Sequence, residues 1–387
     1  MSLNIIRNNA DLSSCISLLN KTQEFAIDLE FDKNYYRYGF NLCLVQIAAE
    51  GNCYLIDPLS KEMDIEKLFP LLEDQDIQKV VFAFGEDLRL LHSLGCFPKN
   101  LYDISTATSL LNYPPSSLTN LIAGILDVDT GKSSQKSNWY QRPLSEEQVN
   151  YAAQDVLHLV TLKDIFCKEA EENGVSEWIT EENSSMDELN FAEQENNSII
   201  KEKDKQGLTE HEWHLFKKLV IFRDEVAKEC NKPGFKIIKK EDLKDLAKDS
   251  RHLMHWNKKK GIYRSLKSEE YKKRILELLK ESAKEAADLG FSKTEPADKP
   301  LDKESYAAYC REKARVNKIK STYFDPIKQK ITEQYGKETA SFIFSNRIIT
   351  DLISNDERKL ERYKRDIILE FAGELKLNPD DIFNSLN

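Results

Sequence analysis

Four short runs of apolar and β-branched residues occupy much of the first 84 positions, and they constrain the fold of this chain more than any other feature. The runs cover residues 24–31, 41–48, 52–59 and 79–84. Runs of this length, separated by turn-forming residues, predict neighbouring strands. Helical periodicity prevails afterwards, in residues 86–94, 105–112, 118–126 and from 145 onward. The order of these elements predicts an α/β domain, a mixed sheet flanked by helices, that ends near residue 172.

The composition changes after this domain. Residues 173–207 are polar, acidic and poor in aromatic residues, which is typical of a linker. Helical periodicity returns over residues 208–290 and, after a second polar break, over residues 300–387. We therefore expect the domain of residues 1–172, an acidic linker with a little helix over 173–207 and two small all-helical domains.

Charge is distributed unevenly along the chain. Residues 1–200 contain 14 Lys and Arg against 32 Asp and Glu, while the remaining residues contain 42 against 34. The net charge of −10 therefore combines an acidic first half with a basic second half. A basic half favours an anionic partner such as a nucleic acid. Lysines that only solvate exposed helices would give the same counts, so charge alone leaves both interpretations open.

Membrane insertion and cysteine-based sites are not indicated by the sequence. No stretch approaches the roughly 18 apolar residues of a membrane span, and the N-terminus lacks a basic stretch followed by an apolar run. The seven cysteines are scattered and form no CxxC motif or Cys/His cluster. We expect a cytoplasmic protein with reduced thiols, no membrane association and no zinc site.

Two carboxylates stand out within the first apolar run. Asp28 and Glu30 lie two positions apart, so the period of a strand projects both from one face. Like charges on an apolar strand repel each other and are costly to desolvate, so a cation is expected to compensate them. A divalent metal ion fits this requirement. A solvated strand edge is the structural alternative for this short motif.

Three further residues could complete such a site. Asp87 follows the run of residues 79–84 through a Gly85 turn and begins a helix, where an acidic residue also suits the helix dipole. Tyr151 and Asp155 lie four positions apart on a later helix and therefore share a face. A buried Tyr–Asp hydrogen bond would be the structural alternative for that pair.

The ordered set of a strand DxE, a helix-start Asp and a helical YxxxD resembles the DEDD-type exonucleases with a tyrosine in their third motif, and more closely the ribonuclease D family. The resemblance spans about residues 20–170, and it implies a ribonuclease H-like exonuclease domain over residues 1–172. Further matching segments are LVQIAAEGNCYLIDPL, GEDLRLL, LYDISTATSLL and GKSSQKSNWYQRPLSEEQVNYAAQDVLHL.

The resemblance implies a metal-dependent 3′-5′ exoribonuclease that releases nucleoside 5′-monophosphates from RNA with a free 3′ end. Two divalent ions, Mg²⁺ or Mn²⁺, are expected as cofactors, with oxygen ligands as hard cations require. Tyr151 is expected to orient the attacking water, and precursor tRNA is the substrate that the family implies. The expected metal ligands are Asp28, Glu30, Asp87 and Asp155.

Residues around the third motif are expected to contact the substrate. Lys132 and Arg142 match family positions suited to phosphate contacts, and Trp139 matches one suited to stacking or structural support. A loop fixed by burial of Trp139 and an ion pair of Arg142 is the structural alternative. The chain departs from the family at Phe82, where a His is common, and at Asn138, where an Asp is usual.

The helical regions carry a second resemblance. Residues 208–290 resemble an HRDC domain, the helical module shared by certain helicases and ribonuclease D, and residues 300–387 resemble a second such module more faintly. RNA is the expected partner of these modules, with protein contacts as the alternative. For the whole chain, a DNA 3′-5′ exonuclease of the same superfamily and a non-catalytic RNA-binding scaffold are the rival interpretations.

Overall fold

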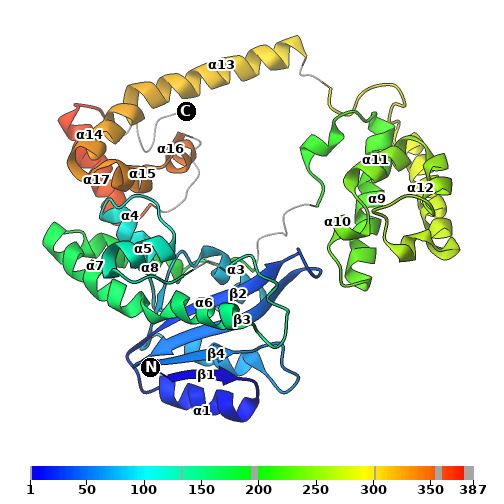
Figure 1. The fold of residues 1–387 in the computed structure, drawn as a ribbon. Helices are drawn as coiled ribbons and strands as arrows, with labels where there is room; N and C mark the ends of the chain where they lie inside the picture. Colours follow the sequence, from blue (N-terminus) through cyan, green and yellow to red (C-terminus); the bar gives the residue numbers. More distant parts are fainter. Residues whose placement is uncertain (1, 132–133, 193–198, 300–301, 354–359, 379–387) are drawn as a thin grey trace. The chain divides into compact units, whose positions relative to one another are not determined.

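The computed structural model describes residues 2–131, 134–192, 199–299, 302–353 and 360–378 (Figure 1). Contacts between residues divide the chain into two compact units. Unit 1 comprises residues 1–30, 42–193 and 306–387, and unit 2 comprises residues 31–41 and 194–305. Among the helices of the described ranges, none combines the length and the apolar character that a bilayer span requires.

Unit 1 is built on a mixed sheet of six strands in the order β1-β4-β3-β2-β5-β6. The pairs β1/β4, β2/β5 and β5/β6 are parallel, and β3/β4 is antiparallel. The four predicted strands are confirmed, and two short outer strands, β1 and β6, were not predicted. The strands are β1 Ser2–Ile6, β2 Glu24–Lys33, β3 Phe40–Ala49, β4 Asn52–Ile56, β5 Gln78–Val81 and β6 Leu101–Asp103.

Helices accompany this sheet, which confirms the predicted α/β class (Figure 1). The longest of them in the first 190 residues, α7, follows α6 after a break at a single residue, His158, where one continuous helix had been expected. The helices are α1 Asn9–Leu19, α2 Phe69–Leu72, α3 Gly85–Ser93, α4 Ile104–Leu110, α5 Leu118–Leu126, α6 Glu146–Leu157, α7 Leu159–Asn173 and α8 Ser176–Met186.

The start of α6 is fixed by a pair of hydrogen bonds between Ser145 and Gln148. The Ser145 side chain accepts a hydrogen bond from the Gln148 backbone N–H (3.2 Å), and the Gln148 side chain accepts one from the Ser145 N–H (3.1 Å). This reciprocal cap satisfies two backbone donors that a helix leaves open at its first turn. Ala152 and Ala153 are buried, so the helix lies close to its neighbours in the core. The cap and these small residues together set the position of the third motif.

Helix α8 lies within the predicted linker over residues 173–207, where a little helix was expected. Residues 176–186 are helical because Ile179 and Asn183 are buried, although the segment is acidic and polar overall. The Asn183 carboxamide oxygen accepts a hydrogen bond from the backbone N–H of Asp103 (3.1 Å), which ties α8 to β6.

The last part of the chain, residues 306–387, belongs to unit 1 by its contacts, whereas the sequence predicted a separate domain over 300–387. Phe324, Phe344 and Phe371 are buried in the same core cluster as residues of α4 and α7. Apolar burial of this kind holds the segment on the first 190 residues. The helices are α13 Lys303–Ile319, α14 Asp325–Tyr335, α15 Lys337–Ile343, α16 Asn346–Ile353 and α17 Arg362–Glu374.

Unit 2 combines helices with the segment of residues 31–41 and has its own core. Its centre is formed by buried residues of α9 and α12, including Phe216, Val220 and Ile275, together with Trp256. The HRDC-like character of residues 208–290 stays a prediction. The helices are α9 Glu210–Glu229, α10 Gly234–Ile237, α11 Lys240–Lys248 and α12 Glu269–Asp288.

Candidate active site

Three of the four predicted carboxylates meet in unit 1. Asp28, Glu30 and Asp155 each place one carboxylate oxygen within 4.8 Å of those of the other two. Asp28 and Glu30 project from the same face of β2, as the strand period predicted, and Asp155 comes from α6. Glu30 and Asp155 are buried, and Asp28 is partly exposed. Three carboxylates this close repel one another unless a cation lies between them.

The fourth carboxylate, Asp87, lies beside this group, but it is not among the carboxylates whose oxygens all lie within 4.8 Å of one another. It is in the first turn of α3, is 8% exposed and receives a hydrogen bond from the backbone of Leu29. Its charge raises the pKa of Asp28, which places the two carboxylates in electrostatic contact. One Asp87 oxygen has no hydrogen-bond partner within the described structure. A buried, unpartnered carboxylate oxygen is costly, and a bound cation would satisfy it.

The acidity of these groups follows from their surroundings. Burial, and then the charges of Asp87 and Asp155, raise the pKa of Asp28 well above its usual value. Burial, and then the charges of Asp28, Asp155 and Asp87, raise the pKa of Glu30 well above its usual value. Burial raises the pKa of Asp87 to about 8 and that of Asp155 to about 6. These raised pKa values show that four ionised carboxylates are unfavourable here unless protons or metal ions compensate their charge.

Tyr151 lies where the sequence predicted, one helical turn before Asp155. Its hydroxyl hydrogen-bonds the Asp155 carboxylate and thereby lowers the pKa of that group, against the larger effect of burial. Its ring lies 6.2 Å from that of Trp139, measured between centroids. Trp139 is 3% exposed, and its indole N–H donates to the Gln135 carbonyl (3.3 Å). The buried indole therefore holds the tyrosine ring in place.

Asp103 is a positioning residue, a role that the sequence analysis did not predict. It caps α4 through the Ser105 N–H (2.8 Å). It also accepts hydrogen bonds from the backbone N–H groups of Ala83 (2.8 Å) and Phe84 (3.0 Å). Ala83 has a φ of +53°, a conformation that costs energy in a residue with a side chain. Asp103 thus stabilises the turn that delivers Asp87.

The predicted substrate contacts have partners within the protein. The Arg142 guanidinium donates to both oxygens of Asp57 (2.6 and 2.8 Å) and to the carbonyls of Cys43 and Trp139. Arg142 and Trp139 therefore have the structural roles that were the alternative for both, and contact with a substrate stays a prediction. Lys132 lies outside the described residues. Of the two departures from the family, Asn138 caps a turn through the Tyr140 N–H (3.2 Å), and Phe82 packs on the core.

The donor set suits a hard divalent cation. All four groups offer carboxylate oxygens, with no His or Cys among them, and Mg²⁺ and Mn²⁺ prefer such ligands. A cation would pair with the unpartnered oxygen of Asp87 and would also offset the repulsion among the other three carboxylates. The residues present therefore fit a metal site.

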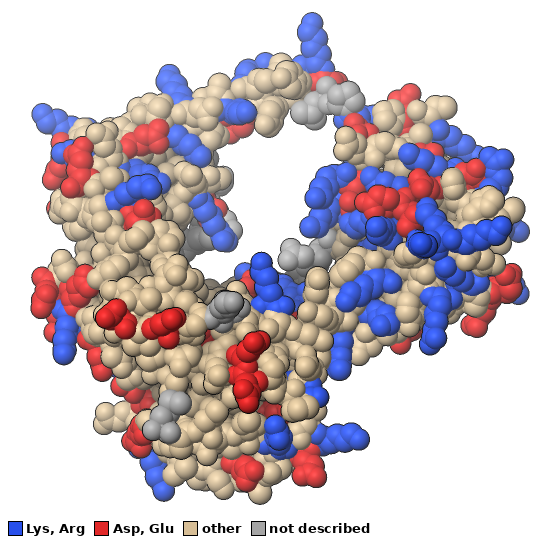
Figure 2. Space-filling model, viewed as in Figure 1, with Lys and Arg blue, Asp and Glu red and all other residues tan. Residues whose placement is uncertain are grey.

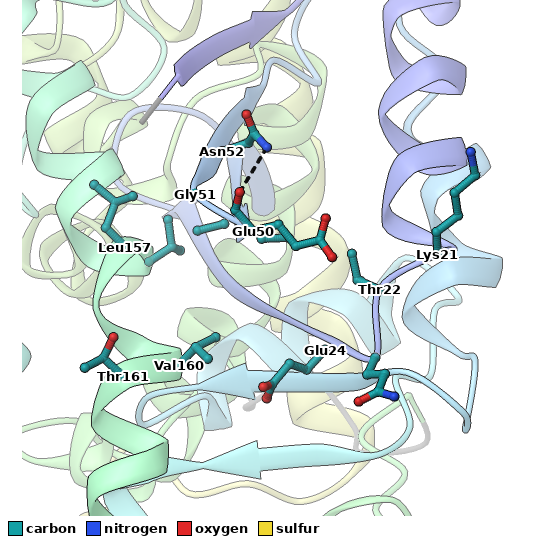
Figure 3. Close-up of a pocket in the computed structure, with 13 residues that line it drawn as sticks. Lys21, Thr22, Glu24, Glu50, Gly51, Asn52, Leu157, Val160 and Thr161 are labelled. Carbon is teal, nitrogen blue, oxygen red and sulfur yellow. Dashed lines mark hydrogen bonds between the residues drawn. The ribbon is translucent and has the colours of Figure 1, made fainter.

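A pocket of about 650 Å³ lies elsewhere on unit 1 (Figure 3). It is lined by residues that precede β2, the turn between β3 and β4, and the region where α6 passes into α7. Lys21, Glu24 and Glu50 are the charged residues of its lining, and Glu24 forms an ion pair with Lys163. The pocket contains none of the four carboxylates, so the carboxylate group is the better candidate for chemistry.

Comparison with known sequences agrees with this geometry. Residues 3–171 match the family model described as 3′-5′ exonuclease. Ribonuclease D of Zymomonas mobilis is 32% identical over 247 residues, which are 63% of this chain and 63% of that protein. Ribonuclease D of Bartonella henselae is 28% identical over 63% of this chain and 61% of that protein. The chain thus aligns with less than two thirds of the length of these relatives.

Solved structures share the fold over nearly the whole chain. RNase D of Escherichia coli has a TM-score of 0.67 and 21% identity, covering 97% of this chain and 99% of that one. The catalytic core of RRP6 from Trypanosoma brucei has a TM-score of 0.63 and 20% identity, covering 74% and 80%. Residues 3–171 thus match the 3′-5′ exonuclease family, and the chain is similar to ribonuclease D in sequence and in fold.

Proposed function

We propose that this chain is a metal-dependent 3′-5′ exoribonuclease of the ribonuclease D type that removes nucleoside 5′-monophosphates from RNA 3′ ends. The observation that carries the proposal is the meeting of Asp28, Glu30 and Asp155, with Asp87 in electrostatic contact and Tyr151 bonded to Asp155. Few arrangements other than a cation site explain so many carboxylates in one buried volume.

The residues divide the chemistry between them. Asp28, Glu30, Asp87 and Asp155 would hold two Mg²⁺ or Mn²⁺ ions. Such ions, when bound, supply a hydroxide nucleophile at neutral pH and offset charge on the leaving 3′ oxygen. The Tyr151 hydroxyl orients the attacking water toward phosphorus, while its bond to Asp155 keeps the phenol in place. Trp139 limits movement of that phenol by packing against its ring.

Charge supports RNA as the substrate class. Unit 2 contains 29 Lys and Arg against 23 Asp and Glu. Figure 2 shows basic side chains gathered on the visible face of its helices. A positive surface strengthens binding to phosphates and speeds the encounter with them. The similar Escherichia coli protein is described as an exoribonuclease involved in structured RNA processing. We extend that substrate class, including precursor tRNA, to this chain.

Two rival functions make different predictions. A DNA 3′-5′ exonuclease would use the same carboxylates, because the metal-dependent hydrolysis does not distinguish ribose from deoxyribose. A non-catalytic scaffold would bind RNA without cleaving it. The presence of all four carboxylates and Tyr151 favours an enzyme over a scaffold, and the similarity to ribonuclease D favours RNA over DNA.

The deciding experiment is digestion of RNA and DNA oligonucleotides of one sequence, labelled at either end, in Mg²⁺, Mn²⁺ or excess chelator. We expect 3′-labelled RNA to release labelled mononucleotide at once and 5′-labelled RNA to shorten stepwise, only when metal is present. Asp155→Asn should lower the rate by about 10³-fold, roughly 4 kcal/mol, because it removes a charged ligand. Glu147→Gln, an exposed acid of the same helix, is the matched control.

Three results would overturn the proposal. Faster cleavage of DNA than of RNA would favour the rival exonuclease. Binding of RNA without any metal-dependent release would favour the scaffold. Full activity of Asp155→Asn would show that the carboxylate group is not the catalytic centre.

A further inference from the structure

Unit 2 displays a group of aromatic rings around one lysine, which we call the Tyr35 cluster: Tyr35, Tyr36, Phe235 and Lys236. We propose that the Tyr35 cluster is a binding site for single-stranded RNA, in which bases stack on the exposed rings and Lys236 contacts a phosphate. The inference deepens the proposed function, because it names a substrate-binding surface outside the carboxylate site.

A buried aspartate fixes the loop that carries the two tyrosines. Asp32 is 5% exposed, and its carboxylate accepts hydrogen bonds from the backbone N–H groups of Tyr35 (3.0 Å), Tyr36 (3.0 and 3.1 Å) and Arg37 (2.8 Å). The Asn34 N–H donates to the Gly39 carbonyl across the same loop (2.7 Å). A loop with this many backbone bonds is ordered before any ligand arrives, which lowers the entropic cost of binding.

A tyrosine at the end of this loop connects it to the helices of unit 2. The Tyr38 hydroxyl donates to the Asp224 carboxylate (2.7 Å), and the Tyr38 N–H donates to the Asn231 side chain (3.3 Å). Asp224 belongs to α9, and Asn231 follows that helix directly. The loop and the start of α10 are therefore parts of one surface of unit 2.

The rings and the lysine form a compact group. The Tyr35 ring lies 4.9 Å from that of Tyr36 and 6.2 Å from that of Phe235, measured between centroids. The Lys236 ammonium lies 5.1, 5.2 and 5.7 Å from the centroids of Tyr35, Tyr36 and Phe235. Within the described part of the chain Lys236 forms no ion pair, whereas Lys240 nearby pairs with Asp204. The Lys236 ammonium is thus held near ring faces and is available to an anionic ligand.

Packing does not explain why these rings are at the surface. Tyr35 is 59% exposed and Phe235 is 50% exposed, although unit 2 has a separate apolar core. Exposed aromatic rings cost hydrophobic free energy, and grouped ones mark interaction sites. The sequence around them is basic: residues 232–240 contain four lysines and no acidic residue. An acidic or purely apolar partner surface would suit only part of this composition.

Single-stranded RNA suits all of it. Every base offers a flat face that stacks on Tyr or Phe, and the phosphates between bases attract lysine. Stacking of this kind tolerates any base sequence. An enzyme that shortens many RNAs from the end requires that tolerance.

The test is binding of a 12-nucleotide single-stranded RNA, measured by fluorescence anisotropy over a range of salt concentrations. All variants carry Asp28→Asn to prevent hydrolysis. Tyr35→Ala combined with Phe235→Ala should weaken binding about 10- to 100-fold with an unchanged salt slope, because stacking carries no counterion term. Lys236→Gln should reduce the log–log salt slope by about 0.7, the value for one phosphate contact to a single strand.

Matched controls separate the cluster from general effects. Tyr309→Ala removes a tyrosine of similar exposure on α13, and Lys313→Gln removes an exposed lysine of the same helix in unit 1; both should leave affinity and slope unchanged. Tyr35→Trp should restore binding, since it keeps a stacking face. Thermal melting verifies that each variant folds. If the double alanine variant misfolds, Tyr35→Ala alone decides, because its ring is the more exposed of the two.

The outcomes are distinguishable from those of the proposed function. With the wild-type carboxylates restored, hydrolysis of a dinucleotide, which occupies only the catalytic centre, should be the same with and without the cluster substitutions. Equal RNA affinity of the double alanine variant and the control would overturn the Tyr35 cluster while leaving the exonuclease intact. Loss of binding to a protein partner, with RNA affinity unchanged, would assign the cluster to that partner instead.

Discussion

Asp87 and Asp103 both stand at the start of a helix, yet their surroundings give them different tasks. The oxygens of Asp103 accept hydrogen bonds from three backbone N–H groups and from the Ser105 hydroxyl, so this carboxylate is satisfied within the protein. One oxygen of Asp87 has no such partner in the described structure. The satisfied group holds the turn in place, and the unsatisfied group is available for a cation.

Removing the Tyr151 hydroxyl tests the division of labour between this residue and the carboxylates. Tyr151→Phe should reduce turnover by about 10²-fold, roughly 2.7 kcal/mol, because the ring still packs on Trp139 while the water loses its orienting group. Metal affinity and RNA affinity should change little. Single-turnover hydrolysis and calorimetric Mn²⁺ titration measure the two effects. Preserved turnover would make Tyr151 a packing residue, and lost metal binding would make it a support of the ligand shell.

The sequence allowed the site residues to be predicted where one local rule sufficed. A strand period of two placed Asp28 beside Glu30, and a helical spacing of four placed Tyr151 beside Asp155. The hydrogen bonds that Asp103 accepts from Ala83 and Phe84 join residues about 20 positions apart, and no local sequence pattern predicts them. Burial of Trp139 likewise depends on packing that only the folded chain defines.

At the scale of elements, α8 and α17 are joined by an interior ion pair. The Lys364 ammonium lies 2.6 Å from Glu182 and 2.8 Å from Glu361, and the Tyr363 hydroxyl also donates to Glu182 (2.6 Å). Trp178 stacks on the Tyr363 ring at 5.3 Å. Burial raises the pKa of Glu182, and Lys364 opposes that rise. A buried pair of this kind is most costly when only one partner remains.

Lys364→Met should therefore destabilise unit 1 by about 3–5 kcal/mol, because Glu182 keeps its charge without a buried cation. Lys364→Met combined with Glu182→Leu should recover much of the loss. Lys330→Met provides the control, since the pair of Lys330 with Glu374 (3.4 Å) is solvent-exposed and should contribute less than about 1 kcal/mol. Urea unfolding followed by tryptophan fluorescence measures these differences. Equal effects of Lys364→Met and Lys330→Met would contradict the buried pair.

A buried lysine in β5 makes the stability of the strand depend on pH. Lys79 is fully buried, its ammonium donates to the Ile77 carbonyl (2.7 Å), and burial lowers its pKa to about 8. Between pH 8 and the unfolded value near 10.5, the unfolded chain holds a proton that the folded chain has lost. The contribution of Lys79 to the free energy of unfolding therefore increases as pH rises through that window.

Lys79→Met should remove this dependence. The variant should become less stable relative to the wild type by on the order of 1–3 kcal/mol between pH 8 and pH 10, since each pKa unit corresponds to about 1.4 kcal/mol. Urea unfolding of both proteins at several pH values gives the difference, in which all other titrating groups cancel. A difference that is constant over this range would show that Lys79 stays charged.

At the scale of the whole molecule, the larger segment of unit 2, residues 194–305, is an insertion between two parts of unit 1. The chain leaves unit 1 after residue 193 and returns to it at residue 306. The sequence predicted the change in composition near residue 173 and the helical regions beyond it. The return of residues 306–387 to the first core was not predictable, because amphipathic helices show which face is buried and not which partner buries it.

Two deletions follow from this arrangement. Truncation after residue 303 should abolish cooperative folding of unit 1, because it exposes the surface that Phe324, Phe344 and Phe371 cover. Replacement of residues 199–303 by about 30 Gly and Ser residues should preserve folding and hydrolysis of a dinucleotide, while RNA affinity and its salt slope decrease. Thermal melting and both assays on each variant test this. A stable, active truncated chain would show that the last helices form an independent domain.

The late return of the chain also governs when unit 1 can first be complete during synthesis. At roughly 5–20 residues per second, about 10–35 seconds separate the appearance of residue 193 from that of Phe371, which closes the core. During this interval the nascent chain already carries all four carboxylates, yet the apolar face that the last helices will cover is bare. Unit 2 is meanwhile complete in sequence from residue 305. A ribosome-bound chain should therefore contain a finished unit 2 before a finished unit 1.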